Sequence, residues 1–340
     1  MKIAIIGAGA IGSVVAAYLT KAGQDVILIG REDQVKAIQK SGLHVKGVRG
    51  EETIHVKGSL ELQDECDLVI FTTKTQDLAE AYRRNNKFLS LSPLILSSQN
   101  GVQADRILKQ WFPSEKILSS IVMFGATYIK PGEVVFNFEG DWIVGTPFAS
   151  NNGQLEDTVQ ILKTAFSVVP SENIMGMKWL KLFVNFNNCI PAMVGKSMQE
   201  TFSDLDLCRL SILLLKEGID VVKKAGIELV SLPSFPSERI LGLANMPIDQ
   251  AAQIINKTLT NLSKEPLYGS ILQSIMRGRH SEIDYINGEV VRLAKEKEWK
   301  APLNERIVSL VHEVEQKKKF FKPEEMKEQF KLVYEANNHE

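Results

Sequence analysis

The chain has 340 residues, of which 44% are hydrophobic, and its 40 basic and 41 acidic residues leave a formal net charge of −1. This length predicts two domains, each with a core of its own. A charge so close to zero gives no overall field that would attract nucleic acid or an acidic membrane, so neither is expected as a partner.

The cysteines and histidines bear on compartment and metal binding. The three cysteines, Cys66, Cys189 and Cys208, are odd in number and far apart, which argues for a reducing compartment and against a disulfide framework. The five histidines show no metal-ligand spacing, so no metal site is expected. The chain starts without the basic region of a secretory leader, and no apolar run reaches roughly 18 residues. We expect a cytoplasmic protein.

Apolar runs alternate with amphipathic stretches through the first half of the chain, which is typical of a parallel, doubly wound α/β sheet. Strands are expected at 2–6, 25–29, 67–73, 93–97 and 117–124, and helices at 11–22, 77–89, 102–111 and 154–166. Residues 43–60 are expected to form a hairpin. Turns at 131–132 and 139–141 predict antiparallel strands around 128, 134–138 and 142–144, at one edge of the sheet.

The pattern changes near Val169-Pro170, and from about Gly176 onward nearly the whole chain reads as helical. The expected helices are 178–194, 205–225, 237–244, 249–262, 283–298, 303–318 and 323–336. The architecture predicted is a dinucleotide-binding domain at 1–172 and an all-helical domain at 173–340, with the active site in the cleft between them. The helices after Asp204 are compatible with a homodimer interface or with a core of their own.

The glycine motif Gly7-Ala8-Gly9-Ala10-Ile11-Gly12 stands between the first apolar run and the first amphipathic stretch. Strand, glycine turn and helix form the context in which this spacing predicts a Rossmann dinucleotide site. Gly7 permits the tight turn, Gly9 lets a pyrophosphate approach the backbone, and Gly12 lets the helix pack close to the strand. A tight turn without a ligand is the alternative.

Arg31 and Lys74 bear on the choice between NAD and NADP. Arg31 follows the second strand, where an acidic residue would accept hydrogen bonds from the ribose 2′-hydroxyl, and its guanidinium suits a 2′-phosphate instead. This favours NADP(H). The neighbouring Glu32 is the counter-indication, because a shift of one residue would place a carboxylate there. Lys74 ends another strand and is either a second phosphate contact or a solvated lysine.

Polar residues stand in two further segments where a reaction could take place. Asn100, before Gly101, follows the fifth strand and is either a turn residue or a ligand for nicotinamide or substrate. Lys181, Asn185 and Asn188 are spaced to share one face of a strongly apolar helix. Buried polar groups need partners, so this stripe indicates a polar cleft, unless Lys181 extends to solvent and the asparagines bond to backbone.

A third segment contains Ser281 and Glu282 after Gly278. Ser281 is expected as the N-cap of the next helix, which puts Glu282 at its first position, where the helix dipole favours a carboxylate. Acidic residues are common in first turns, so this pattern alone does not prove a site.

Taken together, these segments resemble the ketopantoate reductase (2-dehydropantoate 2-reductase) family from Gly7 to about Val311. The matching segments are 7–12, 74, 99–101, 179–185 and, most specific, 279–288. The resemblance implies a Rossmann domain followed by a helical domain. It also implies NADPH-dependent reduction of 2-dehydropantoate to pantoate, a step in coenzyme A synthesis.

The resemblance also implies roles for single residues. Lys181 and Glu282 are implied as catalytic: the lysine protonates the alkoxide, and the carboxylate orients lysine and substrate. Ser270 is implied to bind the substrate carboxylate, and Asn185 its hydroxyl. Asn100 and Glu282 are implied to contact both cofactor and substrate, and Arg31 and Lys74 to bind the 2′-phosphate of NADPH.

The chain departs from the family pattern at one position. The family's second asparagine falls where this chain has Cys189, so Asn188 is expected to face the cleft in its place. Three alternatives stay open: an NADPH-dependent reductase of a different 2-oxo or 3-oxo acid, a non-catalytic NADPH-binding sensor, and a purely structural α/β protein.

Overall fold

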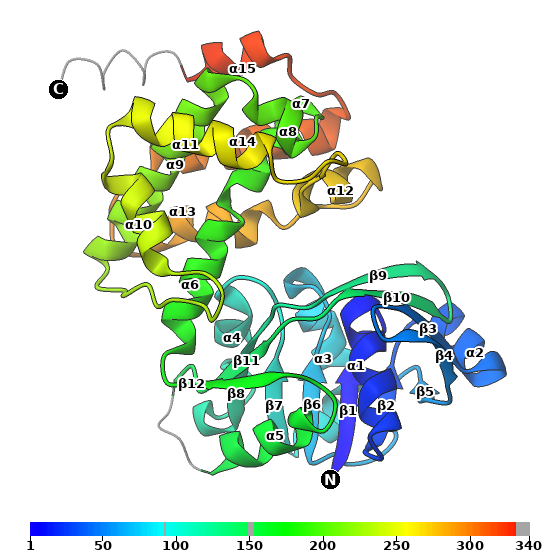
Figure 1. Cartoon of the computed structure of the whole chain (residues 1–340). Coiled ribbons are helices and arrows are strands. Elements are labelled where there is room, and N and C mark those ends of the chain that lie inside the picture. The colour runs from blue at the N-terminus through cyan, green and yellow to red at the C-terminus, as the bar shows by residue number, and fades with distance from the viewer. Residues whose placement is uncertain (92, 149–152, 331–340) are drawn as a thin grey trace. The chain divides into compact units, whose positions relative to one another are not determined.

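The computed structural model describes residues 1–91, 93–148 and 153–330. The chain divides into two compact units, Met1–Lys178 and Trp179–Glu340. Strands and helices alternate in the first unit, and helices make up the described part of the second (Figure 1). The predicted fold class, a doubly wound α/β domain followed by a helical domain, is confirmed.

An eight-stranded sheet forms the centre of the first unit, in the order β12-β11-β8-β7-β6-β1-β2-β5. The neighbours pair in parallel, except that β11 runs antiparallel to β8. The strands are β1 (Lys2–Ile6), β2 (Asp25–Ile29), β5 (Lys57–Ser59), β6 (Leu68–Phe71), β7 (Leu94–Ser97), β8 (Ile117–Val122), β11 (Trp142–Gly145) and β12 (Val168–Ser171).

Helices cover both faces of this sheet, because successive side chains of a strand point to opposite sides. Ile3 and Ile5 of β1 join a core cluster with α1 (Ala10–Lys21) and α5 (Gln154–Lys163). Ala4 and Ile6 join a second cluster with α3 (Leu78–Leu89) and α4 (Gln103–Leu108). A strand buried on both faces reads as an unbroken apolar run, which is why β1 and β2 have the bounds predicted for them.

A second sheet of four strands, in the order β4-β3-β10-β9, corrects one expectation. The strands are β3 (Leu43–Gly47), β4 (Gly50–Ile54), β9 (Gly125–Lys130) and β10 (Glu133–Phe138). The hairpin expected within 43–60 is β3–β4. The strands expected at the edge of the main sheet split: β9 and β10 pair with β3 in the second sheet, and only β11 joins the main one. Helix α2 (Glu32–Ser41) was not predicted.

The second unit packs its helices around α9 (Leu205–Lys224), a helix of 20 residues. Leu210, Leu214 and Val222 of α9 are buried, and within the described residues its most extensive contacts are with six other helices. They are α8 (Met198–Phe202), α10 (Ser237–Asn245), α11 (Ile248–Thr260), α13 (Asn287–Glu296), α14 (Pro302–Lys317) and α15 (Pro323–Gln329). The end of the last predicted helix, 331–336, lies outside the described residues.

Two predicted helices are interrupted, and both predictions were wrong at the break. The stretch 178–194 consists of α6 (Ile174–Val184), a 3₁₀ turn η3 (Phe186–Asn188) and α7 (Cys189–Val194). Pro191 has no N–H to donate and its ring disfavours a continuous helix through this point. The stretch 283–298 is a 3₁₀ turn η4 (Ile283–Tyr285) followed by α13.

Candidate active site

The glycine motif forms the turn between β1 and the N-terminus of α1. Gly7 has φ +124°, and a Cβ there would lie 2.6 Å from the amide nitrogen of Thr73. A Cβ on Gly12 would lie 2.0 Å from the carbonyl oxygen of Gly7, so the third glycine allows the helix to pack against the turn. A Cβ on Gly9 would meet none of the described residues within 4 Å. The first and third glycines are therefore required by packing, whereas the second borders open space.

That open space suits a dinucleotide. Gly9 is the N-cap residue of α1 and has no side chain to cap the helix, so the positive end of the helix dipole is available to an anion. The hydroxyl of Thr72 donates to the carbonyl of Gly7 at 2.8 Å and fixes the turn from the neighbouring strand end. The residues present thus fit a pyrophosphate at this turn.

Strand order brings the predicted cofactor residues to one edge of the sheet. The order β7-β6-β1-β2 is continuous and parallel, so Asn100, Lys74, the glycine turn and Arg31 follow the carboxyl ends of four adjacent strands. The chain proceeds from β1 to β2 on one side and then to β6 on the other. This reversal is the topological switch point at which doubly wound sheets bind ligands.

Arg31 is exposed at the N-cap of α2, one residue after Gly30. A Cβ on Gly30 would lie 2.5 Å from the Cβ of Ala8, so this loop runs directly beside the glycine turn. Glu32, the counter-indication for NADP, pairs with Lys36 one turn along α2. The hydrogen bond from Lys36 holds the pKa of the Glu32 carboxyl below its usual value.

Lys74 and Asn100 stand at strand ends that a buried glutamine ties together. Gln99, 5% exposed, donates to the carbonyls of Phe71 and Thr73 at 3.0 and 3.1 Å and accepts from the hydroxyl of Ser97 at 2.9 Å. Gln99 thus links the ends of β6 and β7, a role that was not predicted from the sequence. The available signal was a glutamine two residues after the apolar strand 94–97. Asn100 itself is exposed, and Lys74 is half-buried.

A buried ion pair lies where α6 begins. The ammonium of Lys178 lies 2.8 Å from Oδ2 of Asp105, and the hydroxyl of Ser119 donates to the same oxygen at 2.7 Å. Lys178 is 2% exposed and Asp105 fully buried. Lys178 is the neighbouring lysine that could substitute for Lys181 as a proton donor, but its ammonium is already engaged within the core of the first unit.

The polar residues Lys181, Asn185 and Asn188, which were expected on one face of a single helix, do not lie in one helix. Lys181, half-buried, lies in the last turn of α6, Asn185 follows the end of that helix, and Asn188 ends η3. The three residues therefore do not share the face of one α-helix, which corrects that expectation. In a 3₁₀ turn, however, side chains three residues apart eclipse each other, and the N–H of Asn188 donates to the carbonyl of Asn185 at 3.1 Å.

Asn188 is the last residue of the 3₁₀ turn, whereas Cys189 is the first residue of α7. Cys189 is fully buried and its Sγ donates to the carbonyl of Phe186 at 3.2 Å; burial raises its pKa to about 12. Such a thiol is an apolar packing residue and not a nucleophile. The Asn188 side chain lies against Gly269, where its Oδ1 would be 2.8 Å from a Cβ. Ser270, exposed, is the next residue and begins α12 (Ser270–Met276). Asn188 and Ser270 are thus brought together.

Glu282 is half-buried and precedes η4, and α13 begins only at Asn287. The expectation that Glu282 takes the first position of a long helix was wrong, because the chain first makes a single 3₁₀ turn. Ser281 does act locally as expected of a cap, since its Oγ accepts from the N–H of Ile283 at 3.4 Å.

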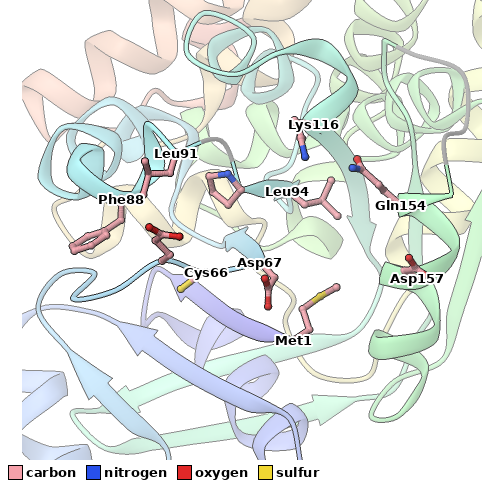
Figure 2. Close-up of a pocket in the computed structure, with 11 residues that line it drawn as sticks. Met1, Cys66, Asp67, Phe88, Leu91, Leu94, Lys116, Gln154 and Asp157 are labelled. Atoms are coloured by element: carbon pink, nitrogen blue, oxygen red, sulfur yellow. The ribbon is translucent and has the colours of Figure 1, made fainter.

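A cavity of about 300 Å³ lies elsewhere in the first unit. Figure 2 shows Met1, Asp67, Leu94 and Lys116 around it, at the amino ends of β1, β6, β7 and β8. It is therefore at the opposite edge of the sheet from the glycine turn. None of the predicted site residues lines it.

In 1–91, 93–148 and 153–330, no group of three or more His, Cys, Asp or Glu side chains could hold a metal ion. Within the same ranges no helix is long and apolar enough to cross a membrane.

The chain matches two family models, "Ketopantoate reductase PanE/ApbA" over residues 3–147 and "Ketopantoate reductase PanE/ApbA C terminal" over residues 173–315. It is 31% identical over 315 residues to a 2-dehydropantoate 2-reductase of Pyrococcus abyssi, covering 92% of this chain and 97% of that protein. A homologue of the same name from Archaeoglobus fulgidus is 27% identical over 316 residues, covering 92% and 98%.

Solved structures point to the same family. A PanE/ApbA family ketopantoate reductase from Ralstonia eutropha JMP134 is 27% identical, with a TM-score of 0.79 and coverage of 93% of this chain and 99% of that one. D-mandelate dehydrogenase, solved with NADH and anilino(oxo)acetate, shares the fold at 24% identity, with a TM-score of 0.78 and coverage of 93% and 99%. The chain therefore belongs to the ketopantoate reductase (PanE/ApbA) family and is an oxidoreductase that uses a nicotinamide cofactor, NADP(H) in that family.

Proposed function

We propose that this protein reduces 2-dehydropantoate to pantoate with NADPH, the step that supplies pantoate for coenzyme A synthesis. The observation that carries the proposal is the row of strand ends at the switch point, where the glycine turn and Arg31 lie side by side and Glu32 is engaged by Lys36. A 2′-phosphate beside Arg31 would find a guanidinium, and the neighbouring Glu32 carboxylate is paired with Lys36.

Apart from Glu282, which belongs to the second unit, the residues proposed to hold the cofactor are those of the switch-point edge. Gly7, Ala8, Gly9, Ala10, Ile11 and Gly12 offer backbone N–H groups to the pyrophosphate. Arg31 and Lys74 bind the 2′-phosphate, and Asn100 and Glu282 contact cofactor and substrate. When bound, the nicotinamide supplies the hydride that adds to the carbonyl carbon of the keto acid.

The helical unit supplies the proton and the substrate contacts in this proposal. As negative charge develops on the carbonyl oxygen, the ammonium of Lys181 stabilises that charge by a hydrogen bond and then donates its proton. Glu282 orients Lys181 and the substrate. Asn185 and Asn188 bind the substrate hydroxyl, and Ser270 its carboxylate. The contact of Asn188 with the turn before Ser270 supports placing both on one substrate.

The test is NADPH oxidation with ketopantoate, compared with α-ketoisovalerate, which lacks the hydroxymethyl group, and with NADH in place of NADPH. We expect ketopantoate to exceed α-ketoisovalerate in kcat/KM by at least about tenfold, because the asparagines would be left without a partner. Higher activity on another 2-oxo acid would assign a different substrate. That alternative is suggested by Cys189 at the family's asparagine position. NADPH binding without turnover of any 2-oxo acid would point to a sensor.

A further inference from the structure

The short segment that contains Glu282 is held on both sides by one helix. Glu315 of α14 accepts from the backbone N–H of Ser281 at 2.7 Å, directly before Glu282. His312, one turn earlier on α14, lies 2.9 Å from Oδ1 of Asp284, two residues after it. The two side chains are also joined, with His312 Nδ1 3.1 Å from Oε2 of Glu315. All of these residues belong to the second unit.

On the N-terminal side of this segment, the N–H of Arg279 donates to the carbonyl of Ser274 at 2.9 Å. Residues 276–280, which precede Ser281, are exposed, and Gly278 has φ +66°. On the C-terminal side, Ile283 is fully buried, and the N–H of Tyr285 donates to the carbonyl of Glu282 at 3.0 Å. Ile283 thus anchors the turn in the core, and the contacts from α14 flank the backbone at Glu282 on both sides.

We propose that His312 and Glu315, the α14 pair, are positioning residues that fix the carboxylate of Glu282 for its contact with the substrate. The proposal rests on the role assigned above to Glu282. Neither member of the pair is a catalytic residue: each acts on the backbone or side chain of a residue that flanks Glu282. Misplacing a reacting group by about 1 Å costs up to roughly a hundredfold in rate, so a loosened turn has a measurable effect.

The charge state of His312 determines how strong this arrangement is. Each ring nitrogen faces a carboxylate, Asp284 from η4 and Glu315 from its own helix, so both bonds have a donor only when the imidazole is protonated. The exposed His280 lies 3.5 Å from the same Glu315 carboxylate. Burial lowers the pKa of His312, but the hydrogen bonds to Asp284 and Glu315 outweigh it, and the net pKa is raised above 6.5.

The direction of the pH effect follows from that shift. Because the folded-state pKa of His312 is raised, the stabilisation is complete below about 6.5, the usual value, and is lost as the pH rises through the folded-state pKa. The orientation of Glu282 is therefore best defined on the acid side of that transition.

The experiment combines His312→Gln with Glu282→Gln and the double variant, measured in the full-length enzyme with NADPH and ketopantoate. We expect His312→Gln to lower kcat/KM by roughly tenfold to a hundredfold, with the NADPH dissociation constant within about twofold of wild type. In the Glu282→Gln background the same substitution should cause no further loss, because there is no longer a carboxylate to position. The ratio of wild-type to His312→Gln activity should fall as the pH rises.

The matched control is His44→Gln in the first unit, where His44 lies 2.9 Å from Glu51 and 3.2 Å from Thr53 on the second sheet. It should keep wild-type kinetics. If His312→Gln does not fold, Glu315→Ala gives the same test, since it removes the acceptor of the Ser281 N–H. An additive loss in the double variant, or unchanged kcat/KM in His312→Gln, overturns the proposal alone. Unchanged activity of Glu282→Gln overturns the role of Glu282 and the proposal with it.

Discussion

Lys181 is half-buried and lies in the last turn of α6, whereas Lys178, one turn earlier, is buried in an ion pair with Asp105. We expect Lys181→Ala to lower kcat by roughly 10²–10⁴-fold, the range for removal of a general acid, with NADPH affinity unchanged. Steady-state kinetics and a fluorescence titration of NADPH measure the two quantities. Lys223→Ala, an exposed lysine of α9, is the control. Near-normal turnover in Lys181→Ala would reassign the proton donor.

The three glycines of the turn differ in what a side chain would contact. Substitutions at them can therefore distinguish a loss of stability from a loss of NADPH binding. Gly9→Val places its Cβ where the described residues leave open space within 4 Å, so we expect a folded protein that no longer binds NADPH. Gly12→Ala places a methyl group against the Gly7 carbonyl and should lower the free energy of unfolding. Urea unfolding and NADPH titration of both variants test this. A Gly9→Val protein with wild-type NADPH affinity would contradict the site.

Arg31 is predicted to decide the choice of cofactor. Arg31→Ala should weaken NADPH binding by roughly tenfold to a hundredfold, as expected for loss of a charged hydrogen bond, and leave NADH binding nearly unchanged. Titration of both cofactors measures the ratio. Arg83→Ala, an exposed arginine of α3, should leave it at the wild-type value. An equal loss for NADPH and NADH would mean that Arg31 does not contact the 2′-phosphate.

At the scale of elements, the pair Lys178–Asp105 attaches the start of α6 to α4. Removing one partner of a buried pair leaves an uncompensated charge, so Lys178→Met should lower the free energy of unfolding by about 3–5 kcal/mol. Adding Asp105→Leu should restore much of that loss. Urea unfolding measures both, with Lys57→Met, which breaks the exposed pair with Asp25, as a control expected near wild type. A Lys178→Met protein of wild-type stability would show that the pair contributes nothing.

Most strands of the first sheet were predictable because their patterns are local, whereas β5 and β12 were not predicted as strands of this sheet. β1 and β2 are short apolar runs, and the glycine turn between β1 and α1 has its own spacing. The second sheet was not predictable because β10 pairs with β3, and the sequence of neither segment indicates that its partner lies so far away in the chain. The break at Asn185 was foreseeable only from Pro191, which stands six residues later in a pattern that is otherwise strongly helical.

The same distinction holds for the site. The types of residues and their strand ends follow from the sequence, so Arg31, Lys74 and Asn100 fall at adjacent strand ends once the strand order is known. Side-chain partners such as Gln99 on Thr73, or Glu315 on Ser281, join segments far apart in the chain, and neither has a motif. The roles of Lys181 and Glu282 stay predictions.

At the scale of the whole molecule, the proposed cofactor residues other than Glu282 fall in Met1–Lys178. NADPH alone should therefore stabilise the protein, by about 2.7 kcal/mol at a hundredfold excess over its dissociation constant. Ketopantoate alone should have little effect, because its proposed contacts depend on Asn100 and the cofactor as well as on the helical unit. Scanning calorimetry with each ligand tests this. Stabilisation by ketopantoate alone would show that the substrate site forms without NADPH.

The parallel pairing of β10 with β3 has a consequence for biosynthesis. While the ribosome is still making the chain, the β3–β4 hairpin emerges about eighty residues before β10, the strand that pairs with the open side of β3. For that interval β3 exposes unpaired backbone amides and carbonyls, a template on which another nascent chain could add a strand. Premature termination between these two segments would release a fragment prone to aggregation.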